Sequence, residues 1–392
     1  MPRCPACLSS EDDPVERRDR VPLLQNAVVP TREAALAFPT GRLDMRACRR
    51  CGFVWNAAFE PARIAYDSTY DNSVQASAVY RAHQEAMVRR LLDVPGPLHV
   101  LEVGCGAGEF LAMLDASGRL ASAIGYDPAW IGQRSFGPHI TVRAEPFTPA
   151  SAAAVPPQIN VVCSRHTIEH IAAPRGFVSA MAELAVQRDI RLFLETPDVT
   201  WILENAAFED LFYEHCSLFA PGAMRRLLAA FGLAATCSPV YGGQYMWVEA
   251  TRGRAEPEAA PDPGLVSRFR ARAAAERTAW QERVRVLGRR GPVAIWGAAS
   301  KGVTFALLTQ GLAMAIDLNR AKQGAFLPVT ALPIVSPQAA RDAGVVAVVV
   351  MNPNYETEIA ADMQRMTWPA ELISLRRPPR SMADDAARTP RP

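Results

Sequence analysis

The stretch VLEVGCGAGEFL, residues 100–111, decides the fold class of this chain. An apolar run ends at Val103, glycines follow at alternate positions, and a segment with one apolar face begins at Glu109. This order predicts a strand, a tight turn and a helix, because glycine tolerates positive φ and lets a backbone pass close to a ligand. The N–H groups at the start of such a helix suit a bound nucleotide or anion. Several dinucleotide-binding folds share this pattern, so it defines a fold class and not yet a ligand.

The chain around this stretch has the alternation of a parallel α/β domain. Apolar runs recur at ASAIGYD (121–127), ITVRAE (140–145), INVVCSRH (159–166) and IRLFLETP (190–197). Helical patterns lie between several of them, which indicates a parallel sheet. The segment ATCSPVYGGQYMWVEA (235–250) predicts an antiparallel pair around Gly242-Gly243. A second strand–turn–helix pattern opens at VAIWGAASKGVTFALL (293–308).

Composition excludes several classes of protein. The 392 residues suffice for two or three domains, and 49% of them are hydrophobic, as in folded proteins. The net charge of +2 gives no general attraction to nucleic acid or membranes. No apolar run reaches the length of a membrane span, and the N-terminus lacks the apolar core of a signal peptide. We therefore expect a cytoplasmic protein that binds a small molecule, with no nucleic-acid or membrane partner; its oligomeric state stays open.

Two cysteine pairs predict a metal site. Cys4-x2-Cys7 and Cys48-x2-Cys51 are tight knuckles that together supply four thiolates, the ligand set of a structural zinc ion. The 40 residues between the pairs require an insertion that loops out. Incidental thiols are one alternative; a redox pair is another, although neither pair follows a strand and opens a helix. We expect a closed, structural zinc site, with the other four cysteines packed in the core.

Two acids make the glycine turn more specific. Glu102 lies just before the turn, and Asp127 ends the next strand, where an acid can accept both ribose hydroxyls of an adenosine. Here the chain resembles the class I S-adenosylmethionine-dependent methyltransferases. The resemblance implies that Glu102 contacts the amino acid portion of the cofactor and that Asp127 holds the ribose. Further candidates for the cofactor site are Gly104, Cys105, Gly106, Gly108, Arg165 and Tyr70. The alternative is a nucleotide turn of some other enzyme.

The segment EDLFYEHCSLF, residues 209–219, places a carboxylate beside an imidazole in an aromatic run. Methylation of carbon requires a base, because a C–H proton must leave before the carbon attacks an electrophilic methyl group. A histidine suits this task near neutral pH, and a neighbouring carboxylate can orient it. The alternative is a solvated Glu-His pair. Upstream, His166 and His170 are four residues apart, but no third ligand is spaced to complete a metal site with them.

Taken together, these motifs resemble a three-domain family typified by the nucleotide-sugar C-methyltransferases. The likeness covers roughly residues 4–375 and includes YDSTYDN, EHIAAP, FYEHCSLFAP, GGQYMWVEA, WGAASKGVTFALL and VVVMNPNYETEI. It implies that His215 is the base, Glu214 its partner, and His170 part of the reacting end of the substrate site. Tyr213, in the same motif, is a further candidate catalytic residue. Sugar-methylating members read Tyr-His-Glu-His here, whereas this chain reads Phe212-Tyr213-Glu214-His215, which bears on the substrate more than on methyl transfer.

The third domain carries a second candidate site. Lys301 and Ser300 lie at a predicted helix start, where free N–H groups suit a phosphate or another anion. Gln244, at the preceding antiparallel turn, is a further candidate for contact with the substrate. The alternative is a degenerate Rossmann-like domain that only packs against its neighbour.

The predicted architecture is α/β, a Rossmann-like class I methyltransferase domain flanked by a small zinc module and a C-terminal Rossmann-like domain. The expected boundaries are 1–70 for the zinc module, 71–251 for the methyltransferase domain, 252–288 for a linker and helix, 289–378 for the C-terminal domain, and 379–392 for a disordered tail. The predicted function is S-adenosylmethionine-dependent methyl transfer, preferably to carbon, on a small anionic metabolite such as a nucleotide-linked keto sugar. The alternatives are an O- or N-methyltransferase of a natural-product or surface-saccharide intermediate, and a catalytically silent scaffold.

Overall fold

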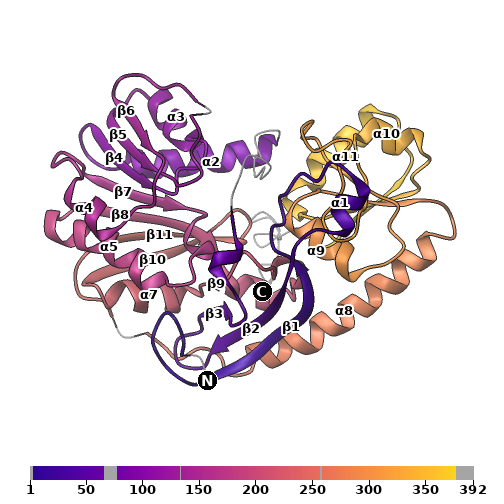
Figure 1. Cartoon of the computed structure of the whole chain (residues 1–392), viewed down its shortest axis with the longest axis horizontal. Helices are drawn as coiled ribbons and strands as arrows, with labels where there is room; N and C mark the ends of the chain where they lie inside the picture. The colour runs from indigo at the N-terminus through magenta and orange to yellow at the C-terminus, as the bar shows by residue number, and fades with distance from the viewer. Residues whose placement is uncertain (1–2, 66–76, 133, 257, 377–392) are drawn as a thin grey trace, which may run out of the picture.

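The computed structural model describes residues 3–65, 77–132, 134–256 and 258–376. Within these ranges the strands form three sheets, with the orders β1-β2-β3-β9, β10-β11-β8-β7-β4-β5-β6 and β14-β13-β12-β15-β16. The two larger sheets lie side by side, and the N-terminal strands run beneath them together with helix α8 (Figure 1). The predicted tail at 379–392 lies outside the described residues. No helix in the described ranges is long and apolar enough to cross a membrane.

The N-terminal sheet is more extensive than the short segments that the sequence indicated. Its antiparallel strands are β1 (Asp12–Pro22), β2 (Thr40–Cys48), β3 (Val54–Asn56) and β9 (Ser217–Leu218), with α1 (Arg32–Leu36) and the 3-10 helix η1 (Pro61–Arg63) between and after them. Strand β1 escaped prediction because most of its residues are charged. Tertiary contacts bury Val15 and Val21 on its inner side, which its sequence DDPVERRDRVP does not show by alternation.

The central sheet has the predicted parallel core closed by an antiparallel pair. Strands β8, β7, β4, β5 and β6 are parallel; β11 pairs antiparallel with β8, and β10 pairs antiparallel with β11 at the edge of the sheet. The bounds are β4 (Leu98–Val103), β5 (Leu120–Tyr126), β6 (Ile140–Arg143), β7 (Val161–Arg165), β8 (Arg191–Pro197), β10 (Leu233–Val240) and β11 (Tyr245–Arg252). The helices are α2 (Ala78–Leu92), α3 (Glu109–Ala116), α4 (Pro149–Ala153), α5 (Pro174–Arg188), α6 (Val199–Glu204) and α7 (Pro221–Ala229), with 3-10 helices η2 (Ile168–His170) and η3 (Phe208–Asp210).

Alternate strand residues build two apolar layers on this sheet. Val100 and Val161 pack with Leu91 of α2 and Phe110 of α3 in one buried cluster. Their neighbours, such as Leu101, pack with residues of α5 and α7 in another. Successive side chains of a strand point to opposite faces, so the continuous apolar runs of these strands fit a sheet covered on both sides.

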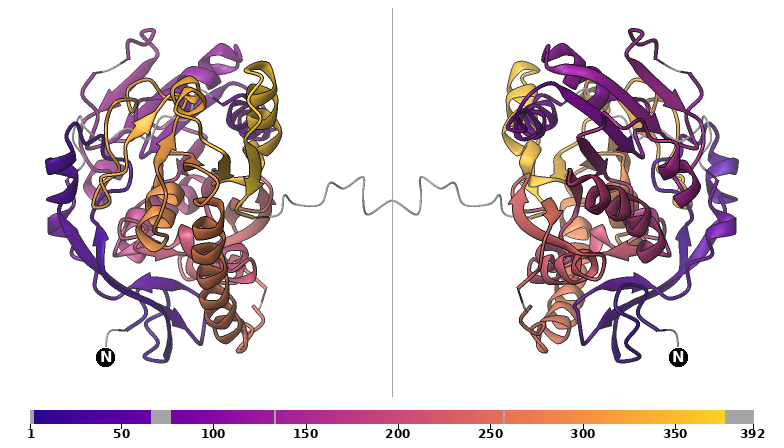
Figure 2. Two further views of the ribbon diagram at one scale, coloured as in Figure 1. Left: turned by 90° about the vertical axis from the view of Figure 1, so that its right-hand side faces the viewer. Right: turned by 90° about the vertical axis from the view of Figure 1, so that its left-hand side faces the viewer.

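The C-terminal sheet is wholly parallel in its described pairings. Its elements are β12 (Val293–Trp296), α9 (Ser300–Leu308), β13 (Met314–Ile316), β14 (Ile334–Val335), α10 (Pro337–Asp342), β15 (Ala347–Val350), η4 (Pro353–Tyr355), α11 (Glu356–Arg365) and β16 (Glu371–Ser374), preceded by α8 (Leu265–Leu287). The side views show α11 beside α2 of the central domain (Figure 2). Ser77, the N-cap of α2, donates a hydrogen bond to Glu358 of α11 at 3.0 Å.

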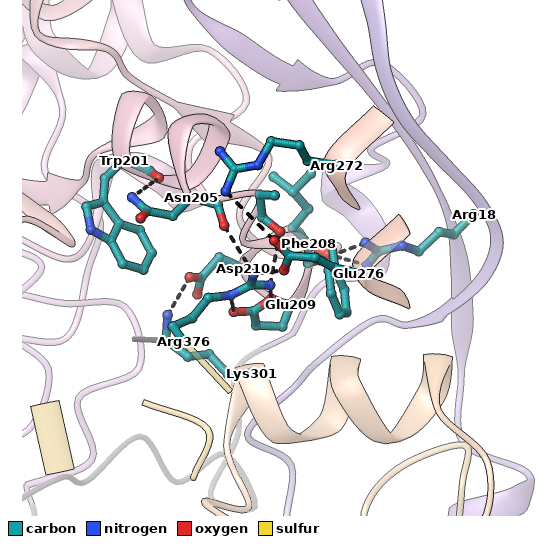
Figure 3. A network of polar contacts seen from close by, with 12 residues as sticks. Arg18, Trp201, Asn205, Phe208, Glu209, Asp210, Arg272, Glu276, Lys301 and Arg376 are labelled. Atoms are coloured by element: carbon teal, nitrogen blue, oxygen red, sulfur yellow. Dashed lines mark hydrogen bonds and ion pairs between the residues drawn. The ribbon is translucent and has the colours of Figure 1, made fainter. Parts of the chain in front are cut away.

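A buried polar network joins these parts beneath the sheets (Figure 3). Arg376, which follows β16, makes a bidentate pair with Glu209 of η3 and a further pair with Glu276 of α8. Arg18 of β1 donates to the carbonyls of Phe208 and Leu211 at 2.7 Å each. Removing one partner of such a buried pair is costly because it leaves a charge uncompensated. The network therefore fixes the chain that leads into the FYEH motif.

Candidate active site

The glycine turn between β4 and α3 has the geometry that the sequence predicts. Gly104, Gly106 and Gly108 all have positive φ, between 53° and 77°. A Cβ on Gly104 would lie 2.0 Å from Thr167 Oγ1, and one on Gly108 would lie 2.4 Å from Phe136. At Gly106 nothing lies within 4 Å of that position. Gly104 and Gly108 are thus required by packing, whereas Gly106 borders open space.

Asp127 and Glu102 lie on either side of this turn. Asp127 accepts hydrogen bonds from the backbone N–H of Gly106 at 2.7 Å and of Ala129 at 2.8 Å. Glu102 is buried, and its Oε2 has no hydrogen-bond partner among the described residues. Burial raises the pKa of Glu102 to about 8, with Asp127 adding to this and Arg165 opposing it. A buried acceptor without a donor suits a ligand that brings a cationic or N–H group.

Arg165 belongs to a second group, centred on the buried carboxylate of Glu195 in β8. Arg165 donates from Nε to Glu195 Oε2 at 2.7 Å, and its guanidinium lies 4.1 Å from the Phe110 ring centroid. His83 of α2 lies 2.5 Å from Glu195 Oε1. Burial alone raises the pKa of Glu195, but Arg165, His166 and His83 outweigh it and hold that pKa well below its usual range. This group fixes the carboxyl end of β7 beside the cofactor turn.

Two other cofactor candidates contribute less to the site. Cys105 is buried, and a Cβ on Gly125 of β5 would lie 2.7 Å from its sulfur. Burial raises the pKa of the Cys105 thiol, so the residue is an uncharged packing group. Tyr70, together with the whole YDSTYDN motif, lies outside the described residues.

The segment after β7 brings histidines and a carboxylate together. His166 has a φ of 49° and lies with Nδ1 3.4 Å from Glu169 Oε1 and Nε2 3.6 Å from Glu195 Oε1. Burial lowers the pKa of His166, but the two carboxylates outweigh it and raise that pKa to about 9. Donor atoms of Glu169, His170 and His215 all lie within 4.8 Å of one another. The structure thus joins the EH of EHIAAP to the EH of FYEH.

His215 is half-buried among aromatic and cationic groups. Its ring centroid lies 4.0 Å from Phe212 and 4.8 Å from His170, which meets it edge-on at 85°. Burial, followed by the charges of His170, His166 and Lys301, lowers the pKa of His215 well below its usual value. The imidazole is therefore neutral near pH 7, the form that can accept a proton.

The motif places Glu214 and Tyr213 close to His215 in the sequence, but the contacts that the structure gives them are with other residues. Glu214 is buried, accepts a hydrogen bond from Gln25 N at 2.8 Å, and lies 4.0 Å from His170 Nδ1. Tyr213 is fully buried; its hydroxyl accepts a hydrogen bond from Glu60 N at 3.0 Å, and its ring packs on Phe59. The structure gives Tyr213 a packing position against the N-terminal module.

The N-terminal sheet holds the chain immediately after His215. Ser217 and Leu218 form β9 and pair with Trp55 and Val54 of β3. The N–H of Asn56 donates to Cys216 O at 3.0 Å. The candidate base is therefore attached to a sheet whose other strands lie more than 150 positions earlier in the chain.

The structure pairs the candidate substrate-binding residues Lys301 and Gln244 with residues other than the histidines of the site. Lys301 of α9 forms an ion pair with Asp210 of η3 and lies 5.4 Å from the Trp201 ring. Gln244 donates to Asn352 at 2.8 Å, and its Oε1 is buried without a hydrogen bond from the described residues. Ser300, the first residue of α9, is half-buried. Lys301 is thus engaged by a carboxylate, where the sequence predicted a group available to an anion.

The four N-terminal cysteines converge as their spacing predicts. Sγ atoms lie 3.8 Å apart between Cys4 and Cys51 and 3.5 Å apart between Cys7 and Cys48, and all four lie within 4.8 Å of one another. A tetrahedral zinc ion with Zn–S bonds of about 2.3 Å separates its sulfurs by about 3.8 Å. The residues present therefore fit a Cys4 zinc ion. The remaining cysteines are buried or half-buried thiols.

Sequence reasoning missed the carboxylates that organise the site. Glu195 lies in an apolar strand and Glu169 between two candidate histidines, and both are almost fully buried. A charged residue inside the otherwise apolar run IRLFLETP was a usable signal for Glu195, because an acid is rarely buried without a partner. For Glu169 no pattern within the sequence marks the fold that brings it to His215.

Comparisons with known proteins agree with this geometry. The family described as "Methyltransferase domain" matches residues 76–238, and the "C-methyltransferase C-terminal domain" matches residues 248–374. C-methyltransferase NovU of Streptomyces niveus is 27% identical over 332 residues, which cover 76% of this chain and 77% of that protein. The chain is a class I S-adenosylmethionine-dependent methyltransferase. Within that class it resembles the C-methyltransferases, whose C-terminal domain matches residues 248–374.

Solved structures resemble part of the chain at low identity. One is the 1,6-didemethyltoxoflavin-N1-methyltransferase of Burkholderia thailandensis, with 15% identity, a TM-score of 0.34, and coverage of 45% of this chain and 79% of that one. Another is an S-adenosylmethionine-dependent methyltransferase of Archaeoglobus fulgidus, with 17% identity, a TM-score of 0.35, and coverage of 45% and 95%. The assignment to the class rests on the two matched domains and the curated relative.

Proposed function

We propose that this enzyme methylates a carbon next to a carbonyl group and that His215 is the general base. The observation that carries the proposal is the position of His215, whose ring nitrogen lies within 4.8 Å of donor atoms of Glu169 and His170 at the carboxyl end of the central sheet. Burial lowers the pKa of this imidazole, which favours the form that accepts a proton. Ligands of open α/β sheets bind beyond these strand ends. Loss of a proton next to a carbonyl leaves an enolate, which is a carbon nucleophile. The matched C-methyltransferase C-terminal domain and the resemblance to a C-methyltransferase support the same reaction.

The residues around the glycine turn have separate parts in this proposal. S-adenosylmethionine, when bound, supplies a methyl group on a sulfonium. Glu102 would receive its amino group, because that carboxylate is buried without a described donor. Asp127 would hold the ribose at the edge of the turn, and Gly106 leaves the space that close backbone approach requires. Arg165, fixed by Glu195, would complete this wall.

For the substrate, we propose a small anionic metabolite such as a nucleotide-linked keto sugar. Support comes from the second tight turn, between β12 and α9. Gly297 there has a φ of 122°, and a Cβ on Gly302 would lie 1.9 Å from Gly297 O, so backbone passes very close to backbone. The helix start at Ser300 offers N–H groups to an anion. Lys301 would contact the anion only after its ion pair with Asp210 is broken.

Replacement of His215 tests the base. His215→Ala should lower kcat by about 10²–10⁴-fold, the usual contribution of a general base, while affinity for S-adenosylmethionine stays unchanged. The matched control is His99→Ala, because His99 bonds Ser122 at 2.8 Å, away from this cluster. Nuclear magnetic resonance of product made with ¹³C-methyl cofactor identifies the methylated atom. An oxygen- or nitrogen-linked methyl group, or full activity of His215→Ala, would reject carbon methylation by this base.

We further infer that Cys4, Cys7, Cys48 and Cys51 bind one structural zinc ion. Their sulfur separations support it, and four thiolates leave no open coordination position for catalysis. The knuckles belong to a buried cluster with Phe53, Trp55 and Phe219. Arg175 of α5 also donates to Ala6 O, inside the first knuckle, at 3.1 Å. The ion would thus fix the module against the methyltransferase domain.

A further inference from the structure

Four of the six histidines of the chain gather in one place with buried carboxylates. His83 lies 2.5 Å from Glu195, and His166 lies between Glu195 and Glu169 at 3.6 and 3.4 Å. Glu169, His170 and His215 complete the set, with donor atoms within 4.8 Å of one another. Imidazoles and carboxylates therefore alternate from helix α2 to the candidate base.

We propose that Glu169 is the carboxylate that stabilises the protonated form of His215, and that His166 holds Glu169 in place. This inference rests on the proposed function of His215 as the base. It gives Glu169 the role that adjacency in the sequence suggests for Glu214, and it makes His166 a positioning residue.

The contacts of the two glutamates differ in the way this assignment requires. Glu214 accepts from the backbone of Gln25 and faces His170 at 4.0 Å. In the described part of the chain, the group whose donor atoms all lie within 4.8 Å comprises Glu169, His170 and His215, and Glu214 is not among them. Adjacent residues in an irregular segment point in different directions, so adjacency in the sequence does not by itself pair Glu214 with His215.

The surroundings of Glu169 leave one oxygen available. Glu169 is 1% exposed, and its Oε2 accepts a hydrogen bond from Thr196 Oγ1 at 3.1 Å. Its Oε1 accepts no hydrogen bond from the described residues and has His166 Nδ1 at 3.4 Å. A buried carboxylate is costly unless cations and donors compensate it. An imidazolium formed at His215 during the reaction would supply such compensation.

The charge balance of the cluster points the same way. Glu169, Glu195 and Glu214 are buried, and Arg165 forms an ion pair with Glu195 among them. Protonated histidines are a further source of positive charge in the cluster. His166 supplies part of this positive charge. The backbone fixes the position of His166: its φ of 49° is strained for a residue with a side chain, and its N–H donates a hydrogen bond to Glu195 O at 2.8 Å.

The chemical step balances with these groups alone and the known co-substrate. The proton of the substrate C–H moves to a ring nitrogen of His215, and the C–H electron pair stays on the substrate as an enolate. The enolate carbon forms a bond to the methyl carbon, and the electron pair of the broken C–S bond stays on sulfur. The imidazolium, next to the carboxylate of Glu169, then returns its proton to water.

The first experiment needs no substrate. In protein with ¹⁵N-labelled histidine, each of the six ring signals is assigned by single replacement and titrated with pH. Glu169→Gln should lower the titration midpoint of His166 by about one pH unit or more, because an opposite charge within a few ångströms is lost. Glu195 of β8 and Tyr245 of β11, which also face His166, are unchanged. Glu214→Gln is the matched control and should leave that midpoint in place; an unmoved midpoint in Glu169→Gln overturns the proposal.

The second experiment measures proton removal itself. With S-adenosylhomocysteine bound, exchange of the C–H next to the carbonyl of a nucleotide-linked 4-keto-6-deoxyhexose is followed in deuterated water. Glu169→Gln should slow exchange and turnover by about 10–10²-fold, more than Glu214→Gln does, with Glu169→Asp between them and cofactor affinity unchanged. A greater loss in Glu214→Gln, or a second metal equivalent that Glu169→Gln removes, overturns the inference. Equal exchange by wild type and His215→Ala instead rejects the proposed function.

Discussion

Glu102 and His215 are both uncharged near neutral pH, for the same physical reason. Burial penalises the ionised form of each, which raises the pKa of Glu102 and lowers that of His215. A protonated carboxyl and a neutral imidazole therefore lie at the same end of one sheet. We expect each to change charge when its proposed partner arrives, Glu102 with the cofactor and His215 with the substrate proton.

Glu102 predicts a pH dependence of cofactor affinity. Its pKa of about 8 in the free protein means that the carboxyl is mostly protonated at pH 7. A cationic amino group favours the carboxylate, so binding releases a proton, and affinity should fall by up to about tenfold per pH unit below 8. Calorimetry at pH 7 in two buffers of different ionisation enthalpy measures this release. Glu102→Gln should bind more weakly and release no proton; equal release from both proteins would contradict the assignment.

At the scale of elements, the β4–α3 turn combines glycines required for two different reasons. Gly104 and Gly108 leave no room for a side chain, because Thr167 and Phe136 fill the positions of their Cβ atoms. Gly106 has room but a φ of 53°. Gly104 and Gly108 are therefore required for packing of the turn, whereas we expect Gly106 to serve ligand binding.

Gly106→Ala tests binding by the turn. Gly118 has a φ of 71° and also has nothing within 4 Å of its Cβ position, so Gly118→Ala controls for backbone strain. Both replacements should cost about 1–2 kcal/mol of unfolding free energy, the penalty of left-handed backbone with a side chain. Gly106→Ala alone should also lose affinity for S-adenosylhomocysteine, measured by calorimetry. Equal affinity of the two variants would place the cofactor elsewhere.

At the scale of the whole molecule, the N-terminal module connects distant parts of the site. Strands β2 and β3 flank Cys48 and Cys51 and lead to β9, which follows His215 directly. Gln25, between β1 and β2, donates its backbone N–H to Glu214. We therefore expect a structural metal in this module to act on the geometry of the site as well as on the folding of the module.

Loss of the proposed zinc ion should therefore reduce turnover as well as stability. Cys48→Ser should lose the metal, lower the unfolding temperature and lower kcat, because β9 is no longer held against a fixed β3. Cys237→Ser is the control, since Cys237 of β10 lies outside the cysteine group. Elemental analysis, thermal unfolding and activity are measured together. A Cys48→Ser protein that lacks metal but keeps wild-type kcat would separate the module from the site.

Local patterns in the sequence were sufficient for the class of protein. The glycine turn, the acid Asp127 at the next strand end, the paired cysteines and the apolar strands depend on residues close in the chain, where spacing alone dictates geometry. The parallel core, the antiparallel pair at Gly242-Gly243 and helix α8 follow from the same kind of information. The methyltransferase class was predictable for this reason.

Only the tertiary structure decided which side chains meet. Glu169 reaches His215 across 46 positions, Lys301 meets Asp210 across 91, and β9 pairs with β3 across the segment that contains strands β4 to β8. Tyr213 and Glu214 are adjacent to the candidate base in the sequence, yet one packs on Phe59 and the other faces His170. Residue order specifies which chemical groups exist and the local backbone that carries them. Long-range packing of apolar faces sets the contacts between those groups, and no periodic sequence pattern within one segment encodes that packing.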